Sequence, residues 1–65
     1  MSVNRLKAKR IDKGWTQTEL ARRSGVSRVT INLIERGDSW LCTKASTLIK
    51  IADALGCKVG DIFFV

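Results

Sequence analysis

Two short helix signals follow one another between residues 16 and 36, with a single glycine between them. Thr16 can cap the first helix, and Glu19 three residues later can complete a capping box with it. Gly25 suits the left-handed backbone conformation in which such a helix ends. Ser27 can then cap the second helix. This spacing predicts two short helices joined by a tight glycine turn.

A further helix is expected before this pair, near residues 3–12. Val3, Leu6 and Ile11 recur there at helical spacing, with lysines and arginines between them. Trp15 follows this helix and is expected to plug the core. The chain contains no proline, so its helices can run without forced breaks.

The clearest helix signal lies after the central pair. The apolar residues follow the i, i+3, i+4, i+7 pattern, and a glycine caps the end. The set comprises Ala45, Leu48, Ile49, Ala52 and Leu55, followed by Gly56. Beyond it, residues 59–65 are predicted to form one helical turn and then an extended tail after Asp61, because that end is rich in strand formers.

These elements predict an all-α protein, a compact bundle of four to five short helices with a helix-turn-helix, in one domain that spans residues 1–65. A short β-strand at the termini is an open alternative. The length of 65 residues excludes two domains. The longest apolar run, residues 62–65, is far too short to cross a bilayer, and the N-terminus has charges where a signal peptide is apolar. We therefore expect a protein of the bacterial cytoplasm or nucleoid, without a membrane partner.

Positive charge is concentrated in the first half of the chain. Residues 1–36 hold nine lysines and arginines against three acidic residues, whereas residues 37–65 hold three of each, so the net charge of +6 lies in the first half. A basic half of this kind favours a polyanionic partner, of which DNA and RNA are the commonest. The alternative is a surface charge that only keeps the protein soluble.

Several function classes lack the residues that they need. The chain has no histidine, and Cys42 and Cys57 do not form a C-x-x-C pair, so a four-ligand zinc site cannot assemble within one chain. There is no glycine-rich phosphate loop and no convincing carboxylate pair for acid–base chemistry. We expect no enzymatic activity, no metal, no cofactor and no small-molecule ligand.

The second helix of the central pair has two different faces. At about 100° per residue, Ile31 and Ile34 point to one side. The opposite side gathers Val29, Asn32, Leu33 and Arg36, with Arg28 at its edge. One face is therefore expected to pack and the other to be free.

Two opposite charges lie on core-facing stripes. Arg10 is one turn beyond Leu6, and Glu35 is one turn beyond Ile31. We expect a partly buried Arg10–Glu35 ion pair that fixes how the first and third helices dock.

The spacing of the whole central stretch is specific. It consists of Gln17 to Ala21, Gly25-Val26-Ser27, Ile31, and Ile34 to Gly37. This stretch resembles the helix-turn-helix of the lambda-type phage repressor, Cro and XRE family. Residues 4–7, 9–11 and 51–56 also resemble the family's first and fourth helices. The chain departs from the family in a longer loop, Gly37 to Thr43, that lacks the frequent proline, and in Ser24 at a normally apolar position.

The resemblance implies sequence-specific binding to double-stranded DNA by a transcriptional regulator, expected to be a repressor that acts as a homodimer on a palindromic operator. The residues assigned to base edges are Ser27, Arg28, Val29, Asn32 and Leu33. Arg28 can donate to guanine, Asn32 can pair with adenine, and Val29 can touch a thymine methyl group. The alternative is an ordinary solvated helix face, and Leu33 can instead pack on the loop or on a partner.

In the family that this stretch resembles, the second helix of the pair reads bases and the first crosses the DNA backbone, so contacts with the backbone are expected of the first helix. The Gln17 amide and the nearby backbone N–H groups can hold a phosphate oxygen. The expected backbone contacts are Arg10, Thr16, Gln17, Arg22, Thr30, Arg36 and Lys44, and further candidate phosphate neighbours are Arg5, Lys7, Lys9 and Arg23. About half of the cations are expected to be merely solvated.

The apolar C-terminal tail, residues 61–65, offers a dimer surface. The expected dimer contacts are Ile62, Phe63, Phe64, Val65 and Trp40. The alternative is that the tail packs on the fourth helix and that Trp40 covers the core. A protein-interaction module, such as an antitoxin with secondary DNA binding, is the alternative function. Binding of single-stranded RNA is disfavoured, because the four aromatic residues are not spaced as a stacking platform.

Overall fold

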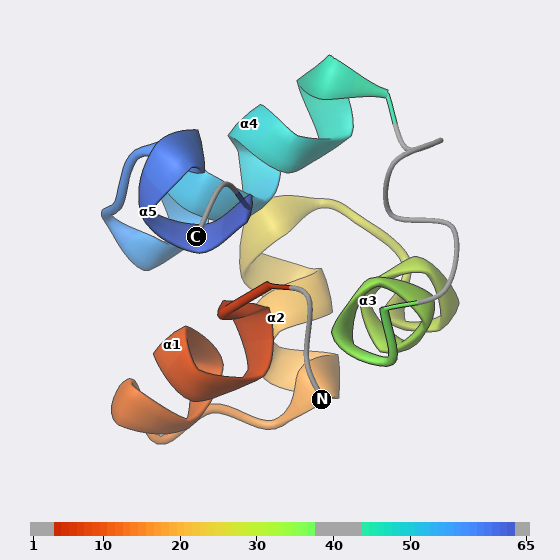
Figure 1. The fold of residues 1–65 in the computed structure, drawn as a ribbon. Coiled ribbons are helices and arrows are strands. Elements are labelled where there is room, and N and C mark those ends of the chain that lie inside the picture. The colour runs from red at the N-terminus through yellow and green to blue at the C-terminus, as the bar shows by residue number, and fades with distance from the viewer. Residues whose placement is uncertain (1–3, 38–43, 64–65) are drawn as a thin grey trace.

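The computed structural model describes residues 4–37 and 44–63, which form five α-helices (Figure 1). The helices are α1 (Leu6–Asp12), α2 (Gln17–Ser24), α3 (Arg28–Glu35), α4 (Ala45–Leu55) and α5 (Val59–Phe63). These residues contain no strand, so the all-α prediction is confirmed, and the alternative of a terminal strand is left only to the terminal residues outside the described ranges. Within the same ranges, no helix combines the length and the apolar character that a membrane crossing requires.

Both helices of the central pair begin at the predicted caps. The Thr16 hydroxyl accepts the N–H of Glu19 at 3.0 Å, and the Ser27 hydroxyl accepts the N–H of Thr30 at 3.2 Å. Gly25 ends α2 with a φ of 74°, in the left-handed region. Each of these signals is local in the sequence, which is why the boundaries of α2 and α3 could be predicted closely.

Only the Thr16 half of the predicted capping box forms within the described residues. The carboxylate of Glu19 instead binds the guanidinium groups of Arg22 and Arg23, the latter at 2.6 Å. The Arg23 guanidinium also lies 4.4 Å from the centre of the Trp15 ring, over its face. Trp15 packs against the core as predicted, and Arg23 covers its outer side.

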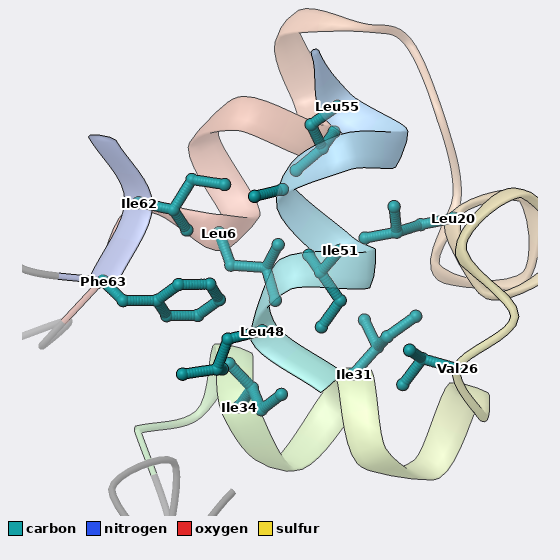
Figure 2. Close-up of a cluster of buried hydrophobic side chains, with 11 residues drawn as sticks. Leu6, Leu20, Val26, Ile31, Ile34, Leu48, Ile51, Leu55, Ile62 and Phe63 are labelled. Atoms are coloured by element: carbon teal, nitrogen blue, oxygen red, sulfur yellow. The ribbon is translucent and has the colours of Figure 1, made fainter. Parts of the chain in front are cut away.

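All five helices contribute to one apolar core. α2 packs against α3 and α4, α4 packs against α5, and α1 packs against α3 and α5. The buried set is Leu6, Leu20, Val26, Ile31, Ile34, Leu48, Ile51, Ala52, Leu55, Ile62 and Phe63 (Figure 2). Full burial of each large apolar side chain stabilises the fold by about 1.5–3 kcal/mol before the entropy of ordering is subtracted.

Some apolar residues that the sequence pattern predicts on the buried side of their helix face solvent instead. On α4, Ala45 and Ile49 face solvent, and Ile49 is 49% exposed, whereas Ile51 is fully buried. The buried residues of this helix have the same i, i+3, i+4, i+7 spacing in a different register. On α1, Ile11 is 56% exposed, because five residues place it about 140° around the helix from Leu6.

The helix α1 begins at Leu6 and not at residue 3 as predicted. Hydrogen bonds hold the two residues before it, Asn4 and Arg5, in place. Asn4 is buried; its Oδ1 accepts the N–H of Leu6 at 3.0 Å, and its Nδ2 donates to the carbonyl of Ile34 at 2.8 Å. The N–H of Arg5 donates to the carbonyl of Ile62 at 2.8 Å. This short stretch therefore connects the start of α1 to the end of α3 and to α5.

The apolar residues of α5 turn into the core. Ile62 and Phe63 are fully buried and lie in the same cluster as Leu6 and Leu48 (Figure 2). The prediction of an extended tail is wrong for these two residues, and so is their prediction as dimer contacts, because their own chain covers their side chains. The other predicted dimer contacts, Phe64, Val65 and Trp40, lie outside the described residues.

The left-handed turn at Gly25 can be tested against a matched glycine. Gly25→Ala is expected to destabilise the protein by about 1 kcal/mol, because a Cβ is strained at this positive φ although no atom lies within 4 Å of it. Gly60→Ala adds the same methyl group in α5, also with open space around it, and should stabilise the protein or leave it unchanged. Urea denaturation measures both effects. Equal effects would contradict the left-handed turn at residue 25.

The network around Glu19 predicts a pH dependence. The hydrogen bond from Arg22, reinforced by Arg23, lowers the pKa of Glu19, although partial desolvation acts in the opposite direction. A carboxylate with a lowered folded-state pKa stabilises the protein above its unfolded pKa, and this stabilisation is lost as the pH falls through the folded value. Glu19→Gln should therefore be less stable than the wild type at neutral pH, and urea curves at a series of pH values should show the gap closing in acid. A gap that does not change with pH would contradict the network.

Candidate nucleic-acid interface

The helix α3 lies at the periphery of the molecule (Figure 1). Its face turned away from the core carries the side chains predicted to read bases. Ile31 and Ile34 are fully buried, so they fix which side of the helix faces outward. Val29 on the outer side is 63% exposed. The outer side as a whole carries Arg28, Val29, Asn32, Leu33 and Arg36, of which only Asn32 is half-buried. The predicted division of α3 into a packed face and a free face is confirmed.

The predicted ion pair between α1 and α3 is present. Arg10 Nε donates to Glu35 Oε2 at 2.7 Å, and Arg10 Nη2 donates to Glu35 Oε1 at 3.1 Å, which is a two-pronged arrangement. The two side chains are 12% and 4% exposed. Arg10 Nη1 also donates to the carbonyl of Trp15 at 2.7 Å. The guanidinium thus holds the end of α3, the segment before α2 and its own helix together.

Gln17 extends this ion pair to the outer face of α3. Its Nε2 donates to Glu35 Oε1 at 3.2 Å and to Asn32 Oδ1 at 3.2 Å. Both hydrogens of the Gln17 amide are therefore used within the protein. The amide nitrogen therefore has no hydrogen left for the predicted phosphate contact, and the contact by the nearby backbone N–H groups stays a prediction. Nothing in the sequence pattern signalled the bond between residues 17 and 32, because it depends on how α2 and α3 cross.

The hydroxyl groups at the start of α3 are partly committed to the cap. Besides accepting the N–H of Thr30, the Ser27 hydroxyl donates to the Thr30 hydroxyl at 2.8 Å. The Thr30 hydroxyl keeps its own proton to donate, which is compatible with its predicted phosphate contact. Ser27 has less capacity left for a base than the sequence suggested.

The other predicted phosphate contacts are distributed over several elements. Thr16 is exposed at the start of α2, Arg22 pairs with Glu19, and Lys44 is exposed immediately before α4. An open hollow beside the end of α3 is lined by Asn4, Arg5, Lys7, Ala8, Ile11, Glu35 and Arg36. Arg5 and Lys7 therefore line the same hollow as Arg36 at the end of α3.

A substitution of Arg10 tests what the ion pair contributes. Arg10→Met removes two hydrogen bonds from the nearly buried Glu35 carboxylate, and should destabilise the protein by about 3 kcal/mol. The double variant Arg10→Met/Glu35→Met removes both charges and should recover much of that loss. Lys7→Met, an exposed cation of the same helix, is the control and should change the unfolding free energy by less than about 0.5 kcal/mol. A urea midpoint of Arg10→Met at or above that of the wild type would mean that the pair sets geometry only.

Comparison with known proteins agrees with this architecture. A family model described as helix-turn-helix matches residues 6–62. The chain is 43% identical over 60 residues to an uncharacterized HTH-type transcriptional regulator of Methanocaldococcus jannaschii, and the match covers 92% of this chain and 88% of that protein. No solved structure matches the chain significantly. With its paired α2 and α3, the chain belongs to the XRE-type helix-turn-helix family.

Proposed function

We propose that the protein binds double-stranded DNA sequence-specifically, with α3 in the major groove and α2 across the backbone. The observation that carries this proposal is the outer face of α3, where polar and apolar side chains project while Ile31 and Ile34 anchor the helix in the core. The major groove of B-DNA, about 12 Å wide, admits an α-helix. The helix α2 packs against α3 and supports it from behind.

The side chains of this face suit base edges of different kinds. Arg28, the first residue of α3, is exposed and can donate two hydrogen bonds to the guanine O6 and N7. Val29 beside it can contact a thymine methyl group. A good bidentate pair discriminates between bases by about 1–3 kcal/mol. Leu33 is also exposed and extends the apolar part of the face.

Charge supports the same partner. The net charge of +6 lies in the half of the chain that forms α1, α2 and α3. Lysines and arginines that neutralise phosphates release counterions, which makes affinity fall steeply with salt. If the affinity of this protein for DNA did not fall with salt, the binding would not come from phosphate contacts.

We further propose that binding regulates transcription, since the similar protein from Methanocaldococcus jannaschii is named as a transcriptional regulator. The simplest mechanism is repression in the cytoplasm by a homodimer that occupies a palindromic operator, because occupancy needs no catalytic group. The two copies of α3 would then lie one helical turn of DNA apart, about 34–36 Å. Trp40, Phe64 and Val65 remain the proposed dimer contacts.

Selection from a random duplex library tests this function. Wild type, Arg28→Ala and Lys50→Ala are compared at one stated salt concentration; Lys50 is an exposed cation on α4, so its substitution is matched in charge. The wild type should enrich a palindromic site. Arg28→Ala should relax the preference at one symmetric pair of positions, corresponding to about 1–3 kcal/mol, whereas Lys50→Ala should keep every preference.

Other outcomes contradict parts of the proposal. A single, non-palindromic half-site would contradict the dimer. Equal changes in Arg28→Ala and Lys50→Ala would contradict a base contact by Arg28. Enrichment of no sequence by the wild type would favour a protein-interaction module instead.

A further inference from the structure

Asn32 is not free to turn its amide. It lies in the middle of the outer face of α3, and its Oδ1 accepts from Gln17 Nε2 at 3.2 Å. The same Gln17 nitrogen donates to Glu35, which Arg10 holds with two hydrogen bonds. A continuous chain of side-chain bonds thus leads from the ion pair to the residue expected to read a base.

The chemistry of this chain sets the direction of every amide in it. Glu35 in its ion pair can only accept hydrogen bonds, so Gln17 must turn its nitrogen toward it. That nitrogen is also the atom beside Asn32, so Asn32 must turn its oxygen inward. The opposite orientation of either amide would bring two acceptors or two donors together, and the bond would be lost.

The nitrogen of Asn32 is consequently the atom that faces outward. Among residues 4–37 and 44–63, no acceptor binds Asn32 Nδ2. The same residues contain no buried side-chain nitrogen or oxygen without a partner, so this nitrogen is in contact with solvent. Asn32 therefore presents two N–H donors to anything that approaches α3.

On the basis of the proposed function, we infer that Gln17 and Glu35 position Asn32 to read DNA as a hydrogen-bond donor, which makes guanine its preferred base. Guanine offers two acceptors in the major groove, N7 and O6, whereas cytosine offers a donor. The pairing of asparagine with adenine needs the amide oxygen to face the N6 donor as well. Gln17 holds that oxygen turned inward, away from the face that DNA would approach, so the adenine contact expected from the sequence loses its second hydrogen bond.

The first test uses the free protein and does not involve DNA. The chain has three side-chain amides, those of Asn4, Gln17 and Asn32, so each gives a resolvable pair of signals in a nitrogen–proton NMR spectrum. The hydrogens of Gln17 should exchange with water more slowly than those of Asn32. Gln17→Met should shift the Asn32 signals, whereas Thr18→Met, the same substitution at the exposed neighbour, should not. Equal exchange at Gln17 and Asn32, or no shift, would overturn the positioning of Asn32.

The second test is base preference. Asn32→Ala identifies the base pair that residue 32 reads, because selection with this variant loses its preference there. At this position the wild type should favour guanine over adenine by about three- to tenfold, the equivalent of one hydrogen bond. Gln17→Met frees the amide and should move the preference toward adenine at this position only. Thr18→Met should leave it unchanged, and a purely structural loss in Gln17→Met would weaken all positions alike.

The outcomes separate the inference from the proposed function. A wild-type preference for adenine at this position overturns the inference while DNA binding stands, and so does a site that Gln17→Met selects without change. If Asn32→Ala alters no position, Asn32 reads no base. If the wild type enriches no sequence, the proposed function and the base preference both fail, and the NMR exchange rates alone decide whether Gln17 positions Asn32.

Discussion

The ion pair between Arg10 and Glu35 connects the core of this protein to its proposed reading surface. A buried ion pair contributes little net stability, since apolar residues of similar volume in its place often make a protein equally stable. Its value here is geometric. The two-pronged contact fixes the Glu35 carboxylate at the end of α3, and this carboxylate then fixes Gln17 on α2. An arrangement of apolar side chains in the same place would hold the helices together, but it would not set the direction of an amide.

The small size of the domain explains why the ends of the described chain take part in the core. A chain of about 60 residues buries only about 60% of the surface that it exposes when unfolded, so few apolar side chains can be left outside. Ile62 and Phe63 complete the cluster around Leu6, and the N–H of Arg5 binds the carbonyl of Ile62. Asn4 adds a polar connection to the end of α3, with both functions of its amide satisfied. The helix α3 therefore packs against α1 and α2, and this stretch connects its end to α5.

Local signals made much of this structure predictable from the sequence. The caps Thr16 and Ser27 and the turn at Gly25 each depend on residues within one helical turn, and the faces of α3 follow from the helical period. Other features depend on tertiary contacts. Two apolar sets with the same spacing exist on α4, and only packing decides that Ile51 is buried and Ile49 is not. The contact between Gln17 and Asn32 depends on the crossing of two helices, which no periodicity in the sequence reveals.

The hydrogen bonds of Gln17 also affect which groups of the proposed interface can contact phosphate and which can contact bases. Since both amide hydrogens of Gln17 are donated within the protein, the proposed phosphate contact at the start of α2 would use backbone N–H groups and the positive end of the helix dipole. A backbone donor is fixed by the helix itself and loses little freedom when a phosphate arrives. Asn32 is likewise oriented before DNA arrives, so less side-chain entropy remains to be lost on binding. In the proposed complex, a protein with few residues for its interface would thereby gain specificity from the order that its core already imposes.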